Sequence, residues 1–165
     1  MDEALKILIV YHSETGNTKA FAEGISGKLT AIGNAVNSVQ LKTKSSVKKA
    51  PVRQDQDIDF VNLPDPHDYD VILFGGPVWA FGPSPVIVEA IRKMDKLSGK
   101  ICLPFVTMAF FLETMGGNAA LRYMSRILAD KGAKVLPGAI CKHMLHKLDN
   151  EIEKNAAKIA TAISL

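Results

Sequence analysis

Apolar residues along the chain follow two alternating patterns, short continuous runs and longer stretches with helical spacing. Residues 5–11 form a continuous run typical of a buried strand, and Phe21, Ile25 and Leu29 then share one face of a helix. The same alternation continues through the rest of the chain. Strands are predicted at residues 5–11, 35–41, 71–75, 101–107 and 134–141, and helices at residues 18–31, 84–97, 117–132 and 149–164.

Strands that alternate with helices through short connections predict a parallel sheet covered on both faces. We therefore expect an α/β three-layer sandwich with a five-stranded parallel sheet, formed by a single domain over residues 1–165. Two features depart from this pattern. Residues 42–67 form a long polar connection of open role, in which residues 58–63 are a candidate extension of the edge strand. Pro104 removes a ladder hydrogen bond, so the fourth strand either begins at Phe105 or contains a bulge.

Composition places the chain among soluble globular proteins, with 47% hydrophobic and 22% charged residues. The apolar runs are too short for a transmembrane helix, and the acidic start after Met1 is unlike a signal peptide. We therefore expect a cytoplasmic protein that makes no membrane contact. Cys102 and Cys141 lie in separate apolar runs, which predicts two buried thiols rather than a disulfide.

The net charge of +3 hides an uneven distribution of charge in the long connection. Its first part is basic, with Lys42, Lys44, Lys48, Lys49 and Arg53. An acidic block follows directly, with Asp55, Asp57, Asp59, Asp65, Asp68 and Asp70. Because no aromatic residues separate the lysines and the acidic block balances them, we interpret this segment as a solvated loop, and we expect no nucleic-acid binding.

The first predicted strand ends in a polar turn, and the first helix begins directly after it. The turn consists of Ser13, Glu14, Thr15, Gly16, Asn17 and Thr18. It aims backbone N–H groups, three hydroxyls and the positive end of a helix dipole at one point, which favours a phosphate. The alternative is an ordinary turn with Thr15 or Thr18 as the N-cap, which explains one or two of the hydroxyls. The motifs of P-loop and dinucleotide-binding proteins are absent.

This strand, Ser/Thr-x-Thr-Gly-x-Thr turn and helix resemble the FMN-phosphate loop of the flavodoxin family. The resemblance implies strand order 2-1-3-4-5, non-covalent FMN and one- or two-electron redox chemistry. Flavodoxin is itself a known example of a ligand at the point where strand order reverses, with FMN between strands one and three. The loops after these two strands should therefore be neighbours.

A second glycine-rich segment follows the third strand and contains the only tryptophan of the chain. Its expected cofactor contacts are Pro77, Val78, Trp79, Ala80, Phe81 and Gly82. The indole can stack on a flavin ring while backbone groups reach the polar edge of that ring. Alternatively, the tryptophan covers the core from a loop. The Gly-x-Pro-Val-Trp sequence also resembles the flavin-ring loop of many short flavodoxin-like proteins.

The segment after the fourth strand would supply the other wall of the flavin pocket. Its expected contacts are Thr107, Met108, Ala109 and Gly116. Phe110, Phe111 and Leu112 either form an apolar lip or cover the core.

Histidines offer little evidence for other chemistry. His12 adjoins the phosphate loop, where it either touches FMN or a substrate or fills the loop. His143 and His146 could share a helix face, but no carboxylate or cysteine completes a metal site, so no metal is expected. No Ser/His/Asp set or spaced carboxylate pair is present, so we expect no catalytic side chain.

Three functional hypotheses follow. The first is an FMN protein that passes electrons between redox partner proteins, as a monomer or homodimer. The second is an FMN-containing reductase that takes hydride from NADH or NADPH and reduces a quinone or similar small-molecule acceptor. The third is a flavodoxin-fold protein without flavin, against which the phosphate loop and Trp79 argue. We favour electron transfer because no extra segment suits a nicotinamide, although the slightly basic charge departs from the acidic carriers that the chain resembles.

Overall fold

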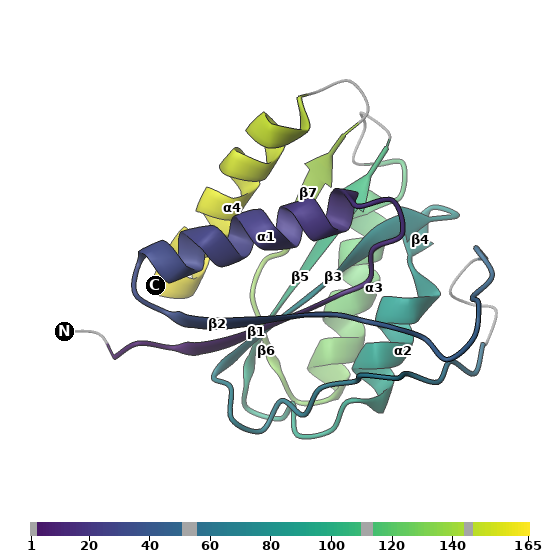
Figure 1. The fold of residues 1–165 in the computed structure, drawn as a ribbon. Helices are drawn as coiled ribbons and strands as arrows, with labels where there is room; N and C mark the ends of the chain where they lie inside the picture. Colours follow the sequence, from purple (N-terminus) through teal and green to yellow (C-terminus); the bar gives the residue numbers. More distant parts are fainter. Residues whose placement is uncertain (1–2, 51–55, 110–113, 144–146) are drawn as a thin grey trace.

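The computed structural model describes residues 3–50, 56–109, 114–143 and 147–165. In this part of the chain, helices cover both faces of a mainly parallel sheet (Figure 1). The elements are β1 (Lys6–Tyr11), α1 (Asn17–Ala31), β2 (Ala35–Gln40), β3 (Val71–Trp79), β4 (Gly82–Pro83), α2 (Pro85–Lys93), β5 (Ile101–Met108), α3 (Gly117–Asp130), β6 (Lys134–Val135), β7 (Ala139–Lys142) and α4 (Leu148–Ser164). None of the helices in these residues is both long and apolar enough to cross a membrane.

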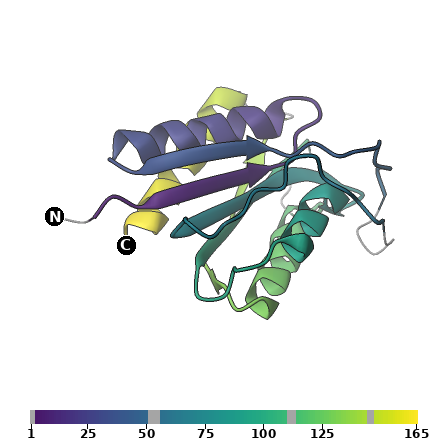
Figure 2. The same cartoon turned by 60° about the horizontal axis from the view of Figure 1, so that its bottom comes forward.

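The strand order is β2-β1-β3-β5-β6, and β7 pairs with β5 beyond the end of β6. Because β6 and β7 together occupy the position of the predicted fifth strand, the expected order 2-1-3-4-5 is confirmed. Figure 2 shows α1 and α4 on one face of the sheet and α2 and α3 on the other. The carboxyl ends of β1, β3 and β5 therefore meet at one edge, which is where the predicted site segments begin.

Alternate residues of β1 supply the two halves of the core. Ile7 and Ile9 pack with the residues of α1 and α4, while Leu8 and Val10 pack with those of α2 and α3. All four side chains are fully buried, as a central parallel strand requires. This burial holds the start of the phosphate loop on a rigid strand.

Neither sequence-based alternative for Pro104 is correct. The strand β5 runs through Pro104 in unbroken register with β3, where Pro104 lies beside Phe74. The N–H of Leu136 donates to the carbonyl oxygen of Cys102 at 2.9 Å, so the backbone polar groups of Cys102 face the side of β5 on which β6 and β7 lie. Because this direction alternates along a strand, those of Pro104 face the same side. There residues 136–138 separate β6 from β7, and the missing N–H falls at this gap. The interruption in strand pairing therefore lies between β6 and β7, and not in β5.

Two further boundaries differ from the prediction by four residues. Helix α2 ends at Lys93, before the predicted residue 97, because Met94 is already extended with φ −82° and ψ 120°. Met94 and Leu97 are nevertheless buried, as their spacing predicts. The strand β3 continues to Trp79, four residues past the predicted end, because its last two residues pair antiparallel with β4.

The long connection after β2 turns back on itself rather than adding a regular strand. Thr43 and Phe60 form a single antiparallel bridge, and the N–H of Val61 donates to the carbonyl oxygen of Lys42 at 2.8 Å. Residues 58–63 therefore extend the edge only through this bridge. The connection consequently returns toward the carboxyl edge of the sheet, beside the first predicted site segment.

Candidate cofactor site

The predicted phosphate loop, residues 13–18, contains a glycine in a conformation that other residues avoid. Gly16 is the N-cap of α1 with φ 95°, and as a glycine it has no side chain that could cap the helix. The alternative interpretation, an ordinary turn with Thr15 or Thr18 as the N-cap, is therefore wrong. The N–H of Lys19 donates to Oγ of Ser13 at 3.2 Å, whereas the N–H groups of the first two helical residues precede any helical acceptor. A Cβ placed on Gly16 would meet nothing within 4 Å, so the space beside these donors is open.

The three hydroxyls of the loop have different environments. Thr18 is buried, and its hydroxyl oxygen lies 2.7 Å from that of Thr107, which is also buried. Ser13 is half-buried and accepts the hydrogen bond described above. Thr15 is exposed, with its hydroxyl 3.4 Å from Nδ2 of Asn17. Thr15 is therefore the hydroxyl best placed to meet a ligand, and Thr18 instead joins the loop to β5.

The structure brings the first two predicted segments together. Tyr11 lies beside Gly75 in the parallel register of β1 and β3, and the N–H of His12 donates to the carbonyl oxygen of Gly75 at 2.9 Å. Trp79, at the end of β3, is half-buried and its ring lies 5.0 Å from that of His12, with the two rings at 86°. The loops after β1 and β3 are therefore neighbours in the fold, as predicted.

The turn between β3 and β4 is strained and rests on a glycine. Ala80 and Phe81 have φ of 48° and 62°, which non-glycine residues adopt at a cost of roughly 1–2 kcal/mol each. A Cβ on Gly116 would lie 2.7 Å from Cα of Phe81 and 2.9 Å from Cγ1 of Val78. The turn therefore packs directly on Gly116, which joins the second predicted segment to the third.

The rest of the third segment is mostly inward-facing. Thr107 and Met108 are each 1% exposed, whereas Ala109 is exposed. The two buried side chains pack beneath the surface, and the carbonyl oxygen of Met108 accepts the N–H of His143 at 3.0 Å. The predicted apolar lip, residues 110–112, lies outside the described residues.

Two side chains approach the loop from segments that sequence reasoning did not assign to the site. Nζ of Lys49, in the long connection, lies 3.2 Å from Oε2 of Glu14 and 5.4 Å from the ring centroid of Trp79. Both ring nitrogens of His143, which follows β7, lie 3.5 Å from Nδ2 of Asn17. Burial lowers the pKa of His143. Its position at the carboxyl end of a strand is the sequence signal that could have placed it here; His146 lies outside the described residues.

A cavity of about 400 Å³ lies between the phosphate loop and the start of the long connection. It is lined by His12, Ser13, Glu14, Leu41, Lys42, Thr43, Ser46, Val47, Trp79 and Val86. The cavity thus unites the first predicted segment with Trp79. Residues 41–47 were not predicted to line the site, because a polar connection carries no periodic signal of what it covers.

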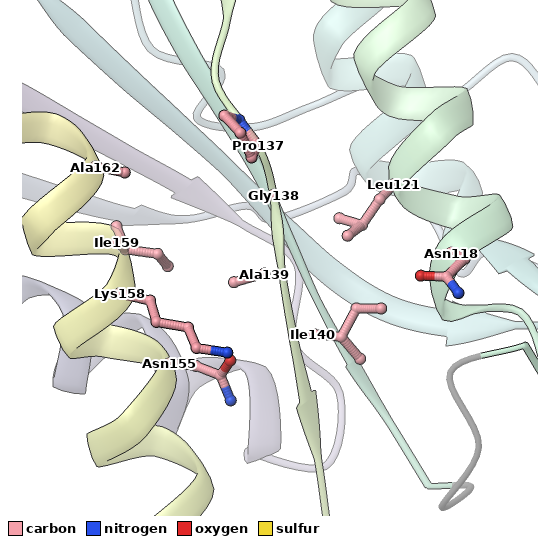
Figure 3. A pocket seen from close by; sticks show the side chains of 10 residues that line it. All are labelled: Asn118, Leu121, Pro137, Gly138, Ala139, Ile140, Asn155, Lys158, Ile159 and Ala162. Carbon is pink, nitrogen blue, oxygen red and sulfur yellow. The ribbon is translucent and has the colours of Figure 1, made fainter.

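A different cavity, of about 330 Å³, lies at the gap between β6 and β7, with α3 on one side and α4 on the other (Figure 3). In Figure 3 Asn155 and Lys158 extend from α4, and Leu121 approaches from α3. None of the predicted cofactor contacts lines this cavity. It is therefore separate from the site at the carboxyl edge of the sheet.

Comparison with known proteins agrees with the fold. A family model described as Flavodoxin matches residues 6–152. The chain is 21% identical to oxidised flavodoxin 1 from Bacillus cereus, with a TM-score of 0.67 over 96% of this chain and 97% of that one. It is 26% identical to two-electron reduced Megasphaera elsdenii flavodoxin, with a TM-score of 0.60 over 92% and 98% of the two chains. None of the curated proteins matches the sequence. The chain therefore belongs to the flavodoxin family, whose cofactor is FMN.

Proposed function

We propose that this chain is an electron-transfer protein whose FMN phosphate lies against the loop of residues 13–18. The observation that carries the proposal is the open N-terminus of α1. Gly16 adopts φ 95°, the N–H groups of Asn17 and Thr18 have no helical acceptor, and the space beside Gly16 is open. Unpaired N–H groups and the positive end of a helix dipole favour a dianionic phosphate. Membership of the flavodoxin family supports the same assignment.

The flavin ring is proposed to lie toward Trp79. Trp79 shares a cavity with Ser13 and Glu14 of the phosphate loop, so one ligand can contact both regions. The turn at Ala80 and Phe81 follows Trp79 directly, and it packs against Gly116. FMN, when bound, supplies one- and two-electron redox chemistry. The chain's own residues bind the phosphate, orient the ring and exclude water from one of its sides.

The proposed partners are redox proteins or a small-molecule electron acceptor, and the proposed location is the cytoplasm. Cys102 and Cys141 are free and buried, and burial raises the pKa of both thiols to about 12. Free cysteines of this kind are typical of reducing compartments. Their raised pKa values also make them poor nucleophiles, so they are not proposed to take part in the redox chemistry.

An absorbance spectrum of the purified protein, followed by titration with FMN, tests the proposal. Thr15→Ala should weaken FMN binding roughly tenfold or more, because a hydroxyl bond to a charged phosphate is lost. Thr30→Ala, at an exposed position near the other end of α1, is the matched control and should leave the affinity unchanged. Trp79→Ala should also weaken binding, and Trp79→Phe should retain most of it. A colourless protein that ignores added FMN contradicts the proposal.

The same sample separates a carrier from a reductase. A carrier should not be bleached by NADH or NADPH alone and should accumulate semiquinone during photoreduction. Rapid bleaching by either nucleotide, with turnover of a quinone, would replace the electron-transfer assignment with that of a reductase.

A further inference from the structure

His12 is anchored to a buried hydroxyl on another element. Its Nδ1 lies 2.7 Å from Oγ of Ser84, which is the N-cap of α2 and is fully buried. The same Oγ accepts the N–H of Val86 at 3.1 Å. The imidazole, from the end of β1, and the start of α2 are therefore joined by one short hydrogen bond.

The hydrogen-bond network assigns the tautomer of His12. A buried hydroxyl has one proton to donate, and Nδ1 of His12 is the acceptor that lies within reach of Ser84. The hydroxyl of Ser84 therefore donates to Nδ1, and the neutral imidazole carries its own proton on Nε2. Rotation of the ring would leave the hydroxyl of Ser84 without this acceptor, so the ring plane is fixed.

The fixed imidazole is in contact with the side chain that is proposed to stack on the flavin. The rings of His12 and Trp79 are nearly perpendicular, with centroids 5.0 Å apart, which is the favourable edge-to-face arrangement of aromatic pairs. Nζ of Lys49 lies 5.4 Å from the indole centroid and is ion-paired with Glu14. Neighbours from two different segments of the chain thus contact Trp79.

We propose that His12 is a positioning residue that, anchored by Ser84, sets the plane of Trp79 and thereby the surface on which the flavin ring stacks. The part that concerns the flavin rests on the proposed function, whereas the anchoring of Trp79 does not. Replacing the imidazole should cost the edge-to-face contact, and FMN affinity should fall roughly 2- to 12-fold as the indole loses its fixed orientation.

Protonation offers a readout of the contact. Burial lowers the pKa of His12 to about 4; Lys49 lowers it further and Glu14 raises it. A proton on Nδ1 removes the acceptor of Ser84, so the contact with Trp79 should loosen near that pH. Because Trp79 is the only tryptophan, the emission of the flavin-free chain reports on this contact directly.

The experiment uses the full chain with and without FMN. The tryptophan emission of the wild type should titrate with a midpoint near pH 4, and His12→Asn should abolish this transition. His12→Phe keeps an aromatic ring but offers no acceptor to Ser84, so it should abolish the transition too and should not restore FMN affinity. His67→Asn, at an exposed histidine, should retain both wild-type properties. Far-UV circular dichroism checks that each variant folds.

The outcomes separate this inference from the proposed function. An emission transition that survives in both His12 variants overturns the inference. So does wild-type affinity for FMN in folded His12→Asn and His12→Phe. A wild type that does not bind FMN contradicts the proposed function, and the emission transition then decides the anchoring of Trp79 alone.

Discussion

Replacing His12 by asparagine should reduce the amount by which the free energy of unfolding of the flavin-free protein falls between pH 7 and pH 5. Burial lowers the pKa of His12 from 6.5 to about 4. Below pH 6.5 the unfolded chain therefore binds a proton that the native chain still excludes. Stability from the neutral imidazole is complete above pH 6.5 and is lost as the pH falls toward 4.

The size of the effect follows from the two pKa values. Between pH 7 and pH 5, linkage predicts that this one group removes about 2 kcal/mol from the free energy of unfolding of the wild type. His12→Asn has no such group, so its free energy of unfolding should fall by about 2 kcal/mol less over the same interval. Burial also lowers the pKa of His143, but that contribution is common to both proteins and cancels in the difference.

Urea unfolding at pH 7 and pH 5, followed by far-UV circular dichroism, measures the difference. His67→Asn, which replaces an exposed histidine, is the matched control, and its loss of stability between pH 7 and pH 5 should equal that of the wild type. Equal losses of stability in the wild type and in His12→Asn would refute the reasoning, because they would show that the folded protein accommodates the protonated imidazole.

Two other substitutions test contacts that join the predicted segments. Gly116→Ala should destabilise the protein by about 2 kcal/mol or more, because Gly116 has φ 111° and a Cβ there would contact the turn. Gly27→Ala, on the open surface of α1, should instead stabilise the protein by roughly 0.5–1 kcal/mol. Thermal unfolding compares the two variants. Thr18→Val and Thr107→Val should each cost about 1–3 kcal/mol by leaving a buried hydroxyl unpaired, and the double variant should recover most of that loss in urea unfolding. Additive losses in the double variant would contradict the pairing of the two hydroxyls.

Local patterns were enough to predict the layers of the fold and the turn that joins β1 to α1. The apolar run of β1, the glycine at position 16 and the helical spacing of α1 are adjacent in sequence, so their geometry depends on neighbouring residues alone. The position of Trp79 beside this loop followed from the strand order that the family resemblance implies. Family comparison then agreed with that fold.

Pairwise contacts between distant segments could not be predicted in this way. Thr18 and Thr107 are 89 positions apart, and both were expected to face the cofactor, yet their hydroxyls are buried against each other. Pro104 was expected to interrupt its own strand, whereas the gap lies in the neighbouring strand. Periodicity gives the face on which a side chain lies but not the partner that it meets there.

The sequence by itself therefore determined the alternating architecture and the glycine-containing turn at the start of α1, because both arise from residues close together along the chain. Only the tertiary structure decided what surrounds Trp79. His12 and Ser84 are 72 positions apart, and the long connection returns to place Lys49 near the indole. Such contacts depend on how β1, β3, α2 and the connection pack in space, and packing is a property of the whole fold.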